Sequence, residues 1–526
     1  MNGTPSTQPG SSGHVHPWLE AIAVLSGTFM VVLDSTVVNV SLPHIAGNLS
    51  ASVDEATWAL TSYLAANAVI LPMTGWLATY FGRKRLMLLS IVGFTTASVL
   101  CGLAPTLPFL IVFRIIQGAT GGVMQPLSQS VMLEAFPPAE RGKAMGFWGI
   151  GIVAAPILGP VLGGWLTDTY SWRWIFFINI PVGIVAVILN RVYLFDPAYL
   201  KRQAGRVDYW GLCYLAIGVG ALQIMLDQGE LEDWFESRWI VALAVTAAVG
   251  LVALIIRELR APAPIVDLRV FRDRTYATGV FLSTLVGFTL FGSMVLLPLM
   301  LQTLFRYPPL QAGYAMAPRG IGSLIATPLV GLLIGHVDTR KLLGAGFVVA
   351  AVTMFWFGSL NLQAGYWDIF WPQALQGVAL GLLFTPLVTV TMDRIPRERM
   401  GNATSLLNVT RNIGGSVGIA ILNTLLANER QAHVNIMGAH VDQYGIQTQQ
   451  ILNSLTGAFM ARGADAATAL QRAYASVFGM VQQQAAMLSF LDGFHLLGVM
   501  MLAVAPLIFL MKRPSRAAEH PTAEAE

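Results

Sequence analysis

The 526-residue sequence is poor in charged residues. Charged side chains make up only 11% of it, whereas soluble domains carry roughly 25%. Hydrophobic residues make up 55%, and the mean hydropathy is +0.62. A soluble protein of this composition would expose large apolar patches to water. The composition therefore excludes an ordinary soluble protein and indicates an outer surface that faces lipid.

Several chemical signatures are also missing. The two cysteines, Cys101 and Cys213, lie in apolar segments without a CxxC pair, so we expect inert thiols rather than a disulfide framework or a metal site. No Walker motif, metal-ligand spacing or nucleophile–base set is present, which disfavours an ATPase or any other enzyme. The net charge of +3 comes from basic residues in short loops between apolar runs, so it does not indicate nucleic-acid binding. No cofactor is expected.

What the sequence has instead is a succession of long apolar runs. A membrane-spanning helix needs about 20 mainly apolar residues. Fourteen runs satisfy this requirement, and the sequence therefore predicts an all-α polytopic membrane protein. The runs begin near Trp18, Ala56, Leu86, Pro108, Ala144, Trp174, Tyr209, Trp239, Tyr276, Ala312, Leu342, Ile369, Ala403 and Met487.

The distribution of basic residues predicts the orientation. With the N-terminus placed in the cytoplasm, 22 of the 31 Lys and Arg residues fall on the cytoplasmic side, six fall outside and three lie within spans. Because cytoplasmic loops carry an excess of Lys and Arg, both termini are expected in the cytoplasm.

The chain also repeats itself. The segment Arg114-Ile-Ile-Gln117-Gly118 recurs 259 residues later as Gln373-Ala-Leu-Gln376-Gly377, and Gly142-Lys-Ala recurs as Gly401-Asn-Ala at the same offset. An even number of spans separates the copies, so both units have the same orientation. Parallel repeats are one transporter architecture, with the substrate site between the halves.

The repeat predicts a division of the chain into two six-helix bundles joined by two additional helices. The segment 428–486 would be a long extracytoplasmic loop, and we expect either a partner-docking element or a disordered or surface-lying insert. The expected segments are a cytoplasmic tail at 1–17, a bundle at 18–195, two linker helices at 208–258, a bundle at 276–511 that contains the loop, and a cytoplasmic tail at 512–526.

Asp34 is the strongest candidate for a functional residue. A carboxylate within a span costs at least ~2.5 kcal/mol, and such residues usually line a cavity or a proton path. Arg114 is its expected partner, because a 1.5 Å rise per residue places both side chains at a similar depth near the outer edge of the membrane. The pair could couple transport to protons, or it could be a fixed ion pair that holds two helices together.

Other polar residues lie within spans. Arg319 and Arg411 could pair across the interface between the halves or contact an anionic substrate, and the sequence does not decide between these roles. Polar amides in spans more often make interhelical hydrogen bonds than bind ligands. The candidate cavity residues of this kind are Asn39, Asn67, Gln117, Gln125 and Asn408.

Two glycine-containing segments complete the set. Gly159-Pro160-Val-Leu-Gly163-Gly164 lies in the fifth span, where small residues allow close helix approach and proline bends the helix. The segment from Gly75 to Gly82-Arg83-Lys84 joins the second and third spans, with glycines for a tight turn and cations that anchor it in the cytoplasm.

These segments together resemble the major facilitator superfamily, specifically the fourteen-span drug:proton antiporters, and are most similar to EmrB-type multidrug exporters. Leu33-Asp34-Ser-Thr-Val-Val-Asn39-Val-Ser-Leu-Pro43 resembles the first-span motif, Leu110 to Gly118 the fourth-span motif, and Gly159 to Gly164 the antiporter motif. Trp172-Arg173-Trp174 to Pro181 is also similar to this family. The chain departs from the loop motif, with Thr79-Tyr80 where Asp-Arg is usual.

The resemblance implies a proton-coupled antiporter that exports lipophilic or amphipathic toxic compounds: drugs, uncouplers, dyes and fatty acids. It implies Arg114 in proton transfer, and a place in the bacterial inner membrane beside a periplasmic adaptor protein and, through it, an outer-membrane channel. Two other interpretations stay open at this stage. One is a dedicated metabolite or siderophore exporter of the same fold, and the other, disfavoured by Asp34 and Arg114, is a receptor or scaffold that moves no solute.

Overall fold

The computed structural model describes residues 16–137, 140–197, 208–261, 264–334, 336–441 and 445–511. These ranges are almost entirely helical, and the only extended pairing within them is an isolated bridge between Ile334 and Val337. Twelve of the described helical segments are long and apolar enough to cross a membrane. The predicted all-α membrane fold is confirmed. Both expected tails lie almost wholly outside the described residues.

The twelve do not include α7 and α16, which have 29 and 41 residues and are long enough to span a bilayer. Helix α7 is rich in Gly and contains Pro, and α16 is rich in polar residues. If both cross the membrane, the total is the predicted fourteen spans. The count of fourteen stays a prediction.

Several of the long apolar segments of the first bundle are broken at glycine or proline. The second span bends at Pro72, where η1 separates α2 from α3, and the fourth bends at Gly121-Gly122, between α5 and α6. Its helices are α1 (Pro17–Asn48), α2 (Val53–Ile70), η1 (Leu71–Met73), α3 (Thr74–Phe81), α4 (Arg83–Leu103), α5 (Leu107–Gly121), α6 (Met124–Ala135), α7 (Arg141–Thr169), α8 (Trp174–Phe177) and α9 (Asn179–Tyr193).

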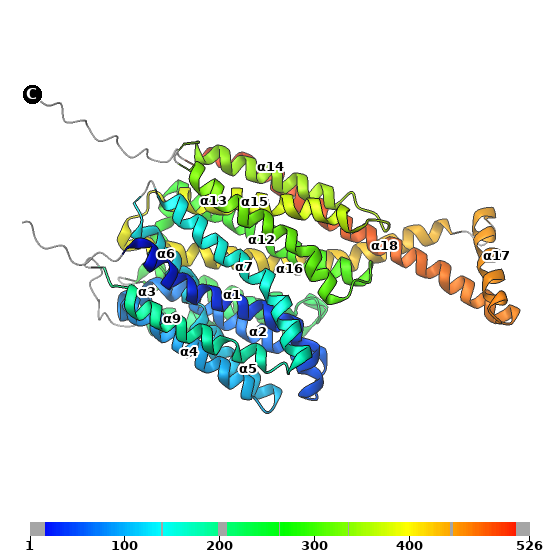
Figure 1. Cartoon of the computed structure of the whole chain (residues 1–526), viewed down its shortest axis with the longest axis horizontal. Coiled ribbons are helices and arrows are strands. Elements are labelled where there is room, and N and C mark those ends of the chain that lie inside the picture. Colours follow the sequence, from blue (N-terminus) through cyan, green and yellow to red (C-terminus); the bar gives the residue numbers. More distant parts are fainter. Residues whose placement is uncertain are drawn as a thin grey trace, which may run out of the picture.

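The second bundle packs against the first along their length, mainly through contacts of α13 with α7 and of α16 with α3 and α6 (Figure 1). The end of the two bundles that carries Pro17 and Met511 is called the terminal end here, and the opposite one the distal end. The helices of the second bundle are α12 (Arg274–Thr303), α13 (Pro309–Leu333), α14 (Thr339–Phe357), α15 (Tyr366–Met392), α16 (Met400–His440) and α18 (Ala466–Val504), followed by η5 (Ala505–Leu510).

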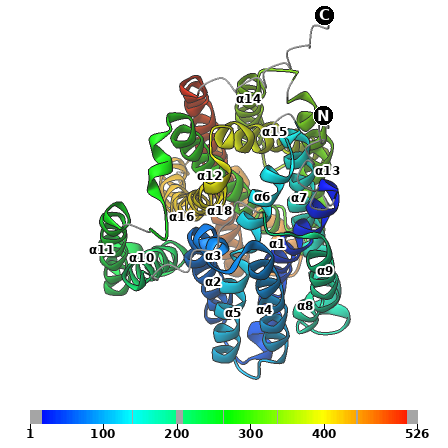
Figure 2. The ribbon, with the colours of Figure 1, turned by 90° about the vertical axis from the view of Figure 1, so that its left-hand side faces the viewer.

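Two further helices, α10 (Tyr209–Gln228) and α11 (Arg238–Arg260), stand to one side of the bundles (Figure 2). The short turn η2 (Trp234–Glu236) joins them, and η3 (Leu268–Arg272) leads on to α12. Helix α10 contacts both bundles, because it packs against α2 and α16. Gln228 Nε2 donates to Thr61 Oγ1 of α2 at 3.1 Å, and Gln223 Nε2 donates to Ser416 Oγ of α16 at 3.0 Å. The linker pair therefore covers the seam between the bundles.

Helix α11 has the two faces expected of a membrane helix at the edge of a protein. Leu243, Ala247 and Leu254 are buried on one face, whereas Val245 and Val249 on the other are 57% and 64% exposed. Apolar side chains at such exposure are stable only in an apolar solvent, so this outer face is suited to lipid.

The described part of the segment 428–486 is mostly helical, and its location outside the cytoplasm stays a prediction. Helices α16 and α18 continue past the distal end of the bundles and are capped by α17 (Ile446–Ala461), which stands across them (Figure 1). At 1.5 Å per residue, α16 is roughly 60 Å long, about twice the ~30 Å apolar core of a bilayer. His433 Nε2 and Asp492 Oδ2, 2.7 Å apart, join the two helices where they leave the bundle. The described part of 428–484 is called the stalk below.

Candidate functional site

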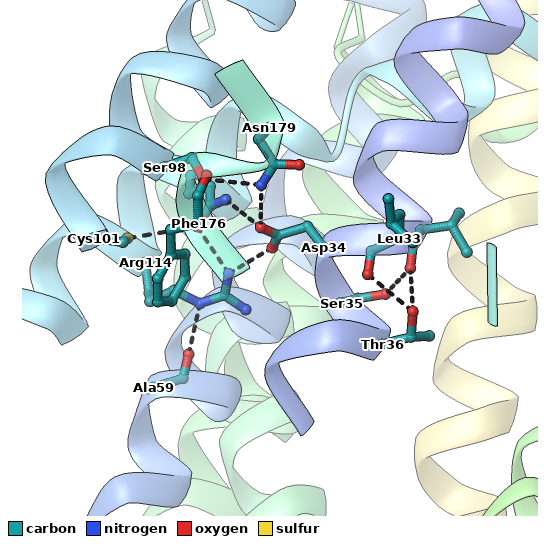
Figure 3. Close-up of polar contacts among 12 residues, drawn as sticks. Leu33, Asp34, Ser35, Thr36, Ala59, Ser98, Cys101, Arg114, Phe176 and Asn179 are labelled. Carbon is teal, nitrogen blue, oxygen red and sulfur yellow. Dashed lines mark hydrogen bonds and ion pairs between the residues drawn. The ribbon is translucent and has the colours of Figure 1, made fainter. Parts of the chain in front are cut away.

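Asp34 lies at the centre of a buried polar network in the first bundle. Its Oδ2 accepts a hydrogen bond from Arg114 Nη1 at 2.7 Å, and neither side chain has any solvent exposure. Its Oδ1 accepts from Gln117 Nε2 at 2.9 Å and from Asn179 Nδ2 at 2.7 Å (Figure 3). The structure thus brings together the two residues that the sequence pairs, and it places Gln117 between them.

Arg114 has partners besides the carboxylate. Its Nε donates to the Ala59 carbonyl oxygen at 3.0 Å, and its Nη1 also donates to Gln117 Oε1 at 2.8 Å (Figure 3). The guanidinium lies 4.1 Å from the centre of the Tyr63 ring, within the range of a cation–π contact. Because these contacts do not depend on Asp34, they hold Arg114 in place whatever the charge of the carboxyl group.

Sequence analysis gave no role to Asn179 or Tyr63. Asn179 lies two residues before the end of the segment Trp172-Arg173-Trp174 to Pro181, and its Nδ2 also donates to Ser98 Oγ at 2.9 Å. A polar amide next to a dense aromatic run was a visible signal for Asn179. The sequence gave no comparable signal for Tyr63, because a tyrosine within an apolar run is common.

The network brings α1, α2, α4, α5 and α9 together through one carboxylate (Figure 3). While Asp34 is ionised, its charge offsets that of Arg114, and both are hydrogen-bonded as buried charges require. A proton on Asp34 would remove the ion pair and leave Arg114 with neutral partners. The arrangement therefore links the protonation of one carboxyl group to the side-chain bonds that join α1 to α5.

The glycines of α7 differ in what surrounds them. A Cβ atom added to Gly159 would collide with Thr36 of α1, and one added to Gly163 would lie 2.9 Å from the Val37 carbonyl oxygen. These two positions allow the close helix contact that the sequence predicts. Gly164 has no neighbour within 4 Å of such a Cβ, so the close-packing interpretation is wrong at this residue. Pro160 lies within α7, and its side chain is outside the described part of the structure.

Cross-contacts between the repeats close the terminal end. A Cβ on Gly75 of α3 would lie 2.7 Å from the backbone nitrogen of Asn402, at the start of α16. A Cβ on Gly331 of α13 would lie 2.7 Å from the carbonyl oxygen of Gly142, at the start of α7. Gly75 of the first repeat therefore packs against the first turn of α16, and Gly331 of the second repeat packs against the first turn of α7. Only glycine permits this backbone approach at Gly75 and Gly331.

The turn between α3 and α4 has the predicted form. Gly82 adopts φ of +86°, a conformation that side chains disfavour. Arg83 Nη2 donates to Glu134 Oε1 of α6 at 2.7 Å, and the Lys84 backbone nitrogen donates to Asp196 Oδ1 at 2.9 Å. Glu134 was missed in the sequence, although an acid at the end of an apolar run signals such a partner.

Asn408 and Arg411 lie at the interface between the bundles. Asn408 Nδ2 donates to Gln129 Oε1 of α6 at 2.6 Å, and Arg411 Nη2 donates to Asn408 Oδ1. The Arg411 guanidinium also lies 4.8 Å from the centre of the Phe384 ring. Arg411 is therefore held by its own neighbours, whereas neither Nη atom of Arg319 on α13 has a hydrogen-bond partner among the residues that the structure describes.

The remaining amides are more peripheral. Asn39 is exposed, and Asn67 and Gln125 are half-buried. Among the described residues, the hydrogen-bond donors to Asp34 are Arg114, Gln117 and Asn179, and they include none of these three. A cavity of about 670 Å³ lies instead toward the distal end, among α12, α16 and α18, with Arg306, Arg430 and Phe490 in its wall.

This helical fold with two related bundles is that of a membrane transporter. Residues 24–419 match the family model of the Major Facilitator Superfamily, and the chain belongs to this family. It is 41% identical to the multidrug export protein EmrB of Haemophilus influenzae over 83% of this chain and 86% of that protein. It is 40% identical to the fatty acid resistance protein FarB of Neisseria gonorrhoeae, over 83% of this chain and 86% of that one.

Solved structures share the fold at low sequence identity. The proton:xylose symporter XylE is 15% identical with a TM-score of 0.60, covering 94% of this chain and 96% of that chain. The human organic anion transporter MFSD10 is 12% identical with a TM-score of 0.60, covering 93% of this chain and all of that chain. At this identity both comparisons support the architecture alone.

Proposed function

We propose that this protein is a proton-coupled antiporter that exports amphipathic toxic compounds from the cytoplasm or the inner leaflet. The observation that carries the proposal is the Asp34–Arg114 pair, at 2.7 Å and fully buried within a span. Burying two charges within a membrane span is expensive, and such residues are therefore by default candidates for function. The relatives named for multidrug export and fatty acid resistance support the substrate class.

The proton gradient is the proposed energy source, with Asp34 as the proton carrier and Arg114 as the cation that responds to its charge. Export needs the substrate site to face alternate sides of the membrane. The glycine contacts of Gly75 and Gly331 hold the two bundles together at the terminal end, which supports a state that is closed on that side. We assign the terminal end to the cytoplasm, in agreement with the positive-inside distribution, and the protein to the inner membrane.

The stalk is the proposed docking site for a periplasmic adaptor, and through it for an outer-membrane channel. It projects from the distal end and carries large apolar side chains at high exposure, including Ile436 at 58%, Ile446 at 78% and Phe478 at 55%. Outside lipid, such side chains indicate a surface that another protein covers. Ser, Thr, Gln and Ala around them suit a helical partner.

The test uses everted vesicles that contain the full chain. Asp34→Asn should abolish efflux driven by a pH gradient, because the side chain no longer exchanges a proton. The variant should still fold, because Arg114 keeps its bonds to Ala59 and Gln117 and its contact with Tyr63. Asp34→Glu should retain part of the activity, since the acid survives with a different reach.

Efflux that continues unchanged in Asp34→Asn would remove this residue from coupling. A dedicated metabolite exporter is distinguished by drug susceptibility of a deletion strain. Restoring the wild-type gene should restore resistance to several unrelated compounds, whereas a dedicated exporter would restore resistance to none or one.

A further inference from the structure

The second bundle contains a counterpart of the Asp34 network with different charges. An offset of 259 residues relates α1 to α12 and α5 to α15, so that Asp34 corresponds to Ser293 and Gln117 to Gln376. The correspondence is structural as well, because Gln117 Nε2 donates to Asp34 Oδ1 at 2.9 Å and Gln376 Nε2 donates to Ser293 Oγ at 3.0 Å.

The same relation extends to the cations. At the offset of 259, Arg114 corresponds to Gln373. The Gly75–Gly331 offset of 256 relates α2 to α13 and pairs Tyr63 with Arg319. The packing agrees, since a Cβ on Gly118 would touch the Tyr63 carbonyl oxygen, and a Cβ on the equivalent Gly377 would touch the Arg319 carbonyl oxygen. The two networks are thus built on the same positions.

Their charges differ. The first network has one carboxylate and one guanidinium, whereas the second has a guanidinium at Arg319 and neutral groups at Ser293, Gln373 and Gln376. In the described part of the chain, no carboxylate oxygen lies within 4.0 Å of Arg319. Both Arg319 Nη atoms and both polar atoms of the Gln373 amide are buried without a partner. The second network therefore has unused donors and one uncompensated positive charge.

Arg319 also lies deep in the membrane. It is ten residues from the start of α13, or roughly 15 Å at 1.5 Å per residue, and this is the middle of a ~30 Å apolar core. Arg319 is only 6% exposed. A buried arginine without a counter-charge is strongly unfavourable, and intramembrane cations usually pair with an anion or face an aqueous cavity.

We propose that Arg319 binds the anionic head group of the exported substrate, with the Gln373 amide as a second donor. The substrate class is then an amphipathic monoanion, such as a fatty acid carboxylate, whose apolar tail remains among apolar helix surfaces. The head group supplies the negative charge that Asp34 supplies in the first bundle. This assignment rests on the proposed export function and names the substrate charge for it.

The experiment compares two substrates in proteoliposomes that contain the full chain and carry a pH gradient. Dodecanoate is the anionic probe and ethidium the cationic one. In Arg319→Gln, the KM for dodecanoate should rise by about tenfold or more, because a charge-assisted hydrogen bond and a counter-charge are lost. The KM for ethidium should change by less than about twofold. Arg319→Lys should show a smaller loss for dodecanoate, because the positive charge remains.

Ser293→Asp provides a second, independent variant. It places in the second network the carboxylate that the first one has, so it should compete with the substrate head group for Arg319. The same selective loss of dodecanoate transport is expected. Arg411→Gln is the matched control, since Arg411 is buried in the same bundle but held by Asn408 and Phe384. Any loss in this control should fall equally on both substrates.

Three results would overturn the proposal. An equal loss of both substrates in Arg319→Gln, with normal membrane levels, would assign a purely structural role to the arginine. Unchanged dodecanoate kinetics would remove Arg319 from recognition. Thermal stabilisation of the detergent-solubilised wild type by chloride, abolished by Arg319→Gln and not produced by dodecanoate, would make the site one for an inorganic anion.

The proposed function can fail separately. If the wild type transports neither probe, the proposed export of these compounds is wrong. The role of Arg319 in anion binding is then tested by a binding measurement. Dodecanoate should raise the melting temperature of the solubilised wild type and not that of Arg319→Gln, and the absence of this difference would contradict it.

Discussion

Gly163 lies where α7 touches α1, whereas the next residue, Gly164, has open space around it. The sequence motif suggests close packing at both glycines. The structure shows it at Gly163 and not at Gly164. A side chain at Gly163 would press on the backbone of Val37, three residues after Asp34. The contact therefore fixes the part of α1 that carries the buried carboxylate.

We predict that Gly163→Leu abolishes transport and that Gly164→Leu retains it. Overpacking at Gly163 should cost about 1–3 kcal/mol or more, because the obstructing atom is backbone and cannot rotate away. Efflux in everted vesicles, normalised to the amount of protein in the membrane, measures the difference. Equal activity of the two variants would show that the α1–α7 contact does not control transport.

At the scale of the element, the stalk is the part of the chain for which the sequence analysis specified no helix bounds. Its Ala, Gln and Leu are good helix formers, and α17 lies beyond the distal end of the bundles (Figure 1). Helices α16 and α18 can therefore simply continue out of the bundle. The apolar residues along them then remain exposed.

We predict that replacing 428–484 by a short polar linker leaves proton-coupled efflux in vesicles intact and lowers whole-cell resistance. The core network around Asp34 contains no stalk residue, whereas handover to a periplasmic partner needs exposed surface. A finer variant is Phe478→Glu, with Gln447→Glu, another exposed stalk position, as the charge control.

Dye efflux in vesicles and resistance in whole cells should be measured for each stalk variant. A parallel fall of both would make the stalk part of the transport core. No change in either would make it dispensable and remove this support for an adaptor.

At the scale of the whole molecule, the two repeats close the terminal end by reciprocal contacts, Gly75 on Asn402 and Gly331 on Gly142. Alternating access requires these contacts to form and break. Each contact therefore belongs to one conformational state, and a substitution there shifts the balance between states rather than the fold of either bundle.

We predict that Gly75→Val or Gly331→Val favours opening of the terminal end and lowers efflux. A clash of about 1–3 kcal/mol would change the ratio of closed to open molecules by roughly 5- to 150-fold. A cysteine introduced at the buried Thr404, in a chain without Cys101 and Cys213, should then react faster with an impermeant maleimide. Gly401→Ala is the control, because its added Cβ meets only the Gly75 Cα at 3.5 Å. An unaltered labelling rate in the valine variants would contradict the gating role.

The sequence by itself determined the membrane fold, the two-fold repeat and the pairing of Asp34 with Arg114. The physical reason is that a bilayer leaves few options: apolar runs of fixed length must be helices, and a buried charge must find a partner at its own depth. Depth follows from counting residues along a helix, which is why the pair could be found without a structure.

Only the tertiary structure decided the contacts that depend on rotation and neighbours. The roles of Asn179 and Tyr63, the difference between Gly163 and Gly164, and the helical stalk do not follow from residue spacing. Sequence analysis gave Arg319 and Arg411 the same two alternatives. In the structure Arg411 bonds to Asn408 of its own helix and lies against the Phe384 ring of α15, whereas the described residues offer neither Nη atom of Arg319 a partner. Such proximity between helices far apart in the chain is set by packing of the whole bundle, and no local pattern encodes it.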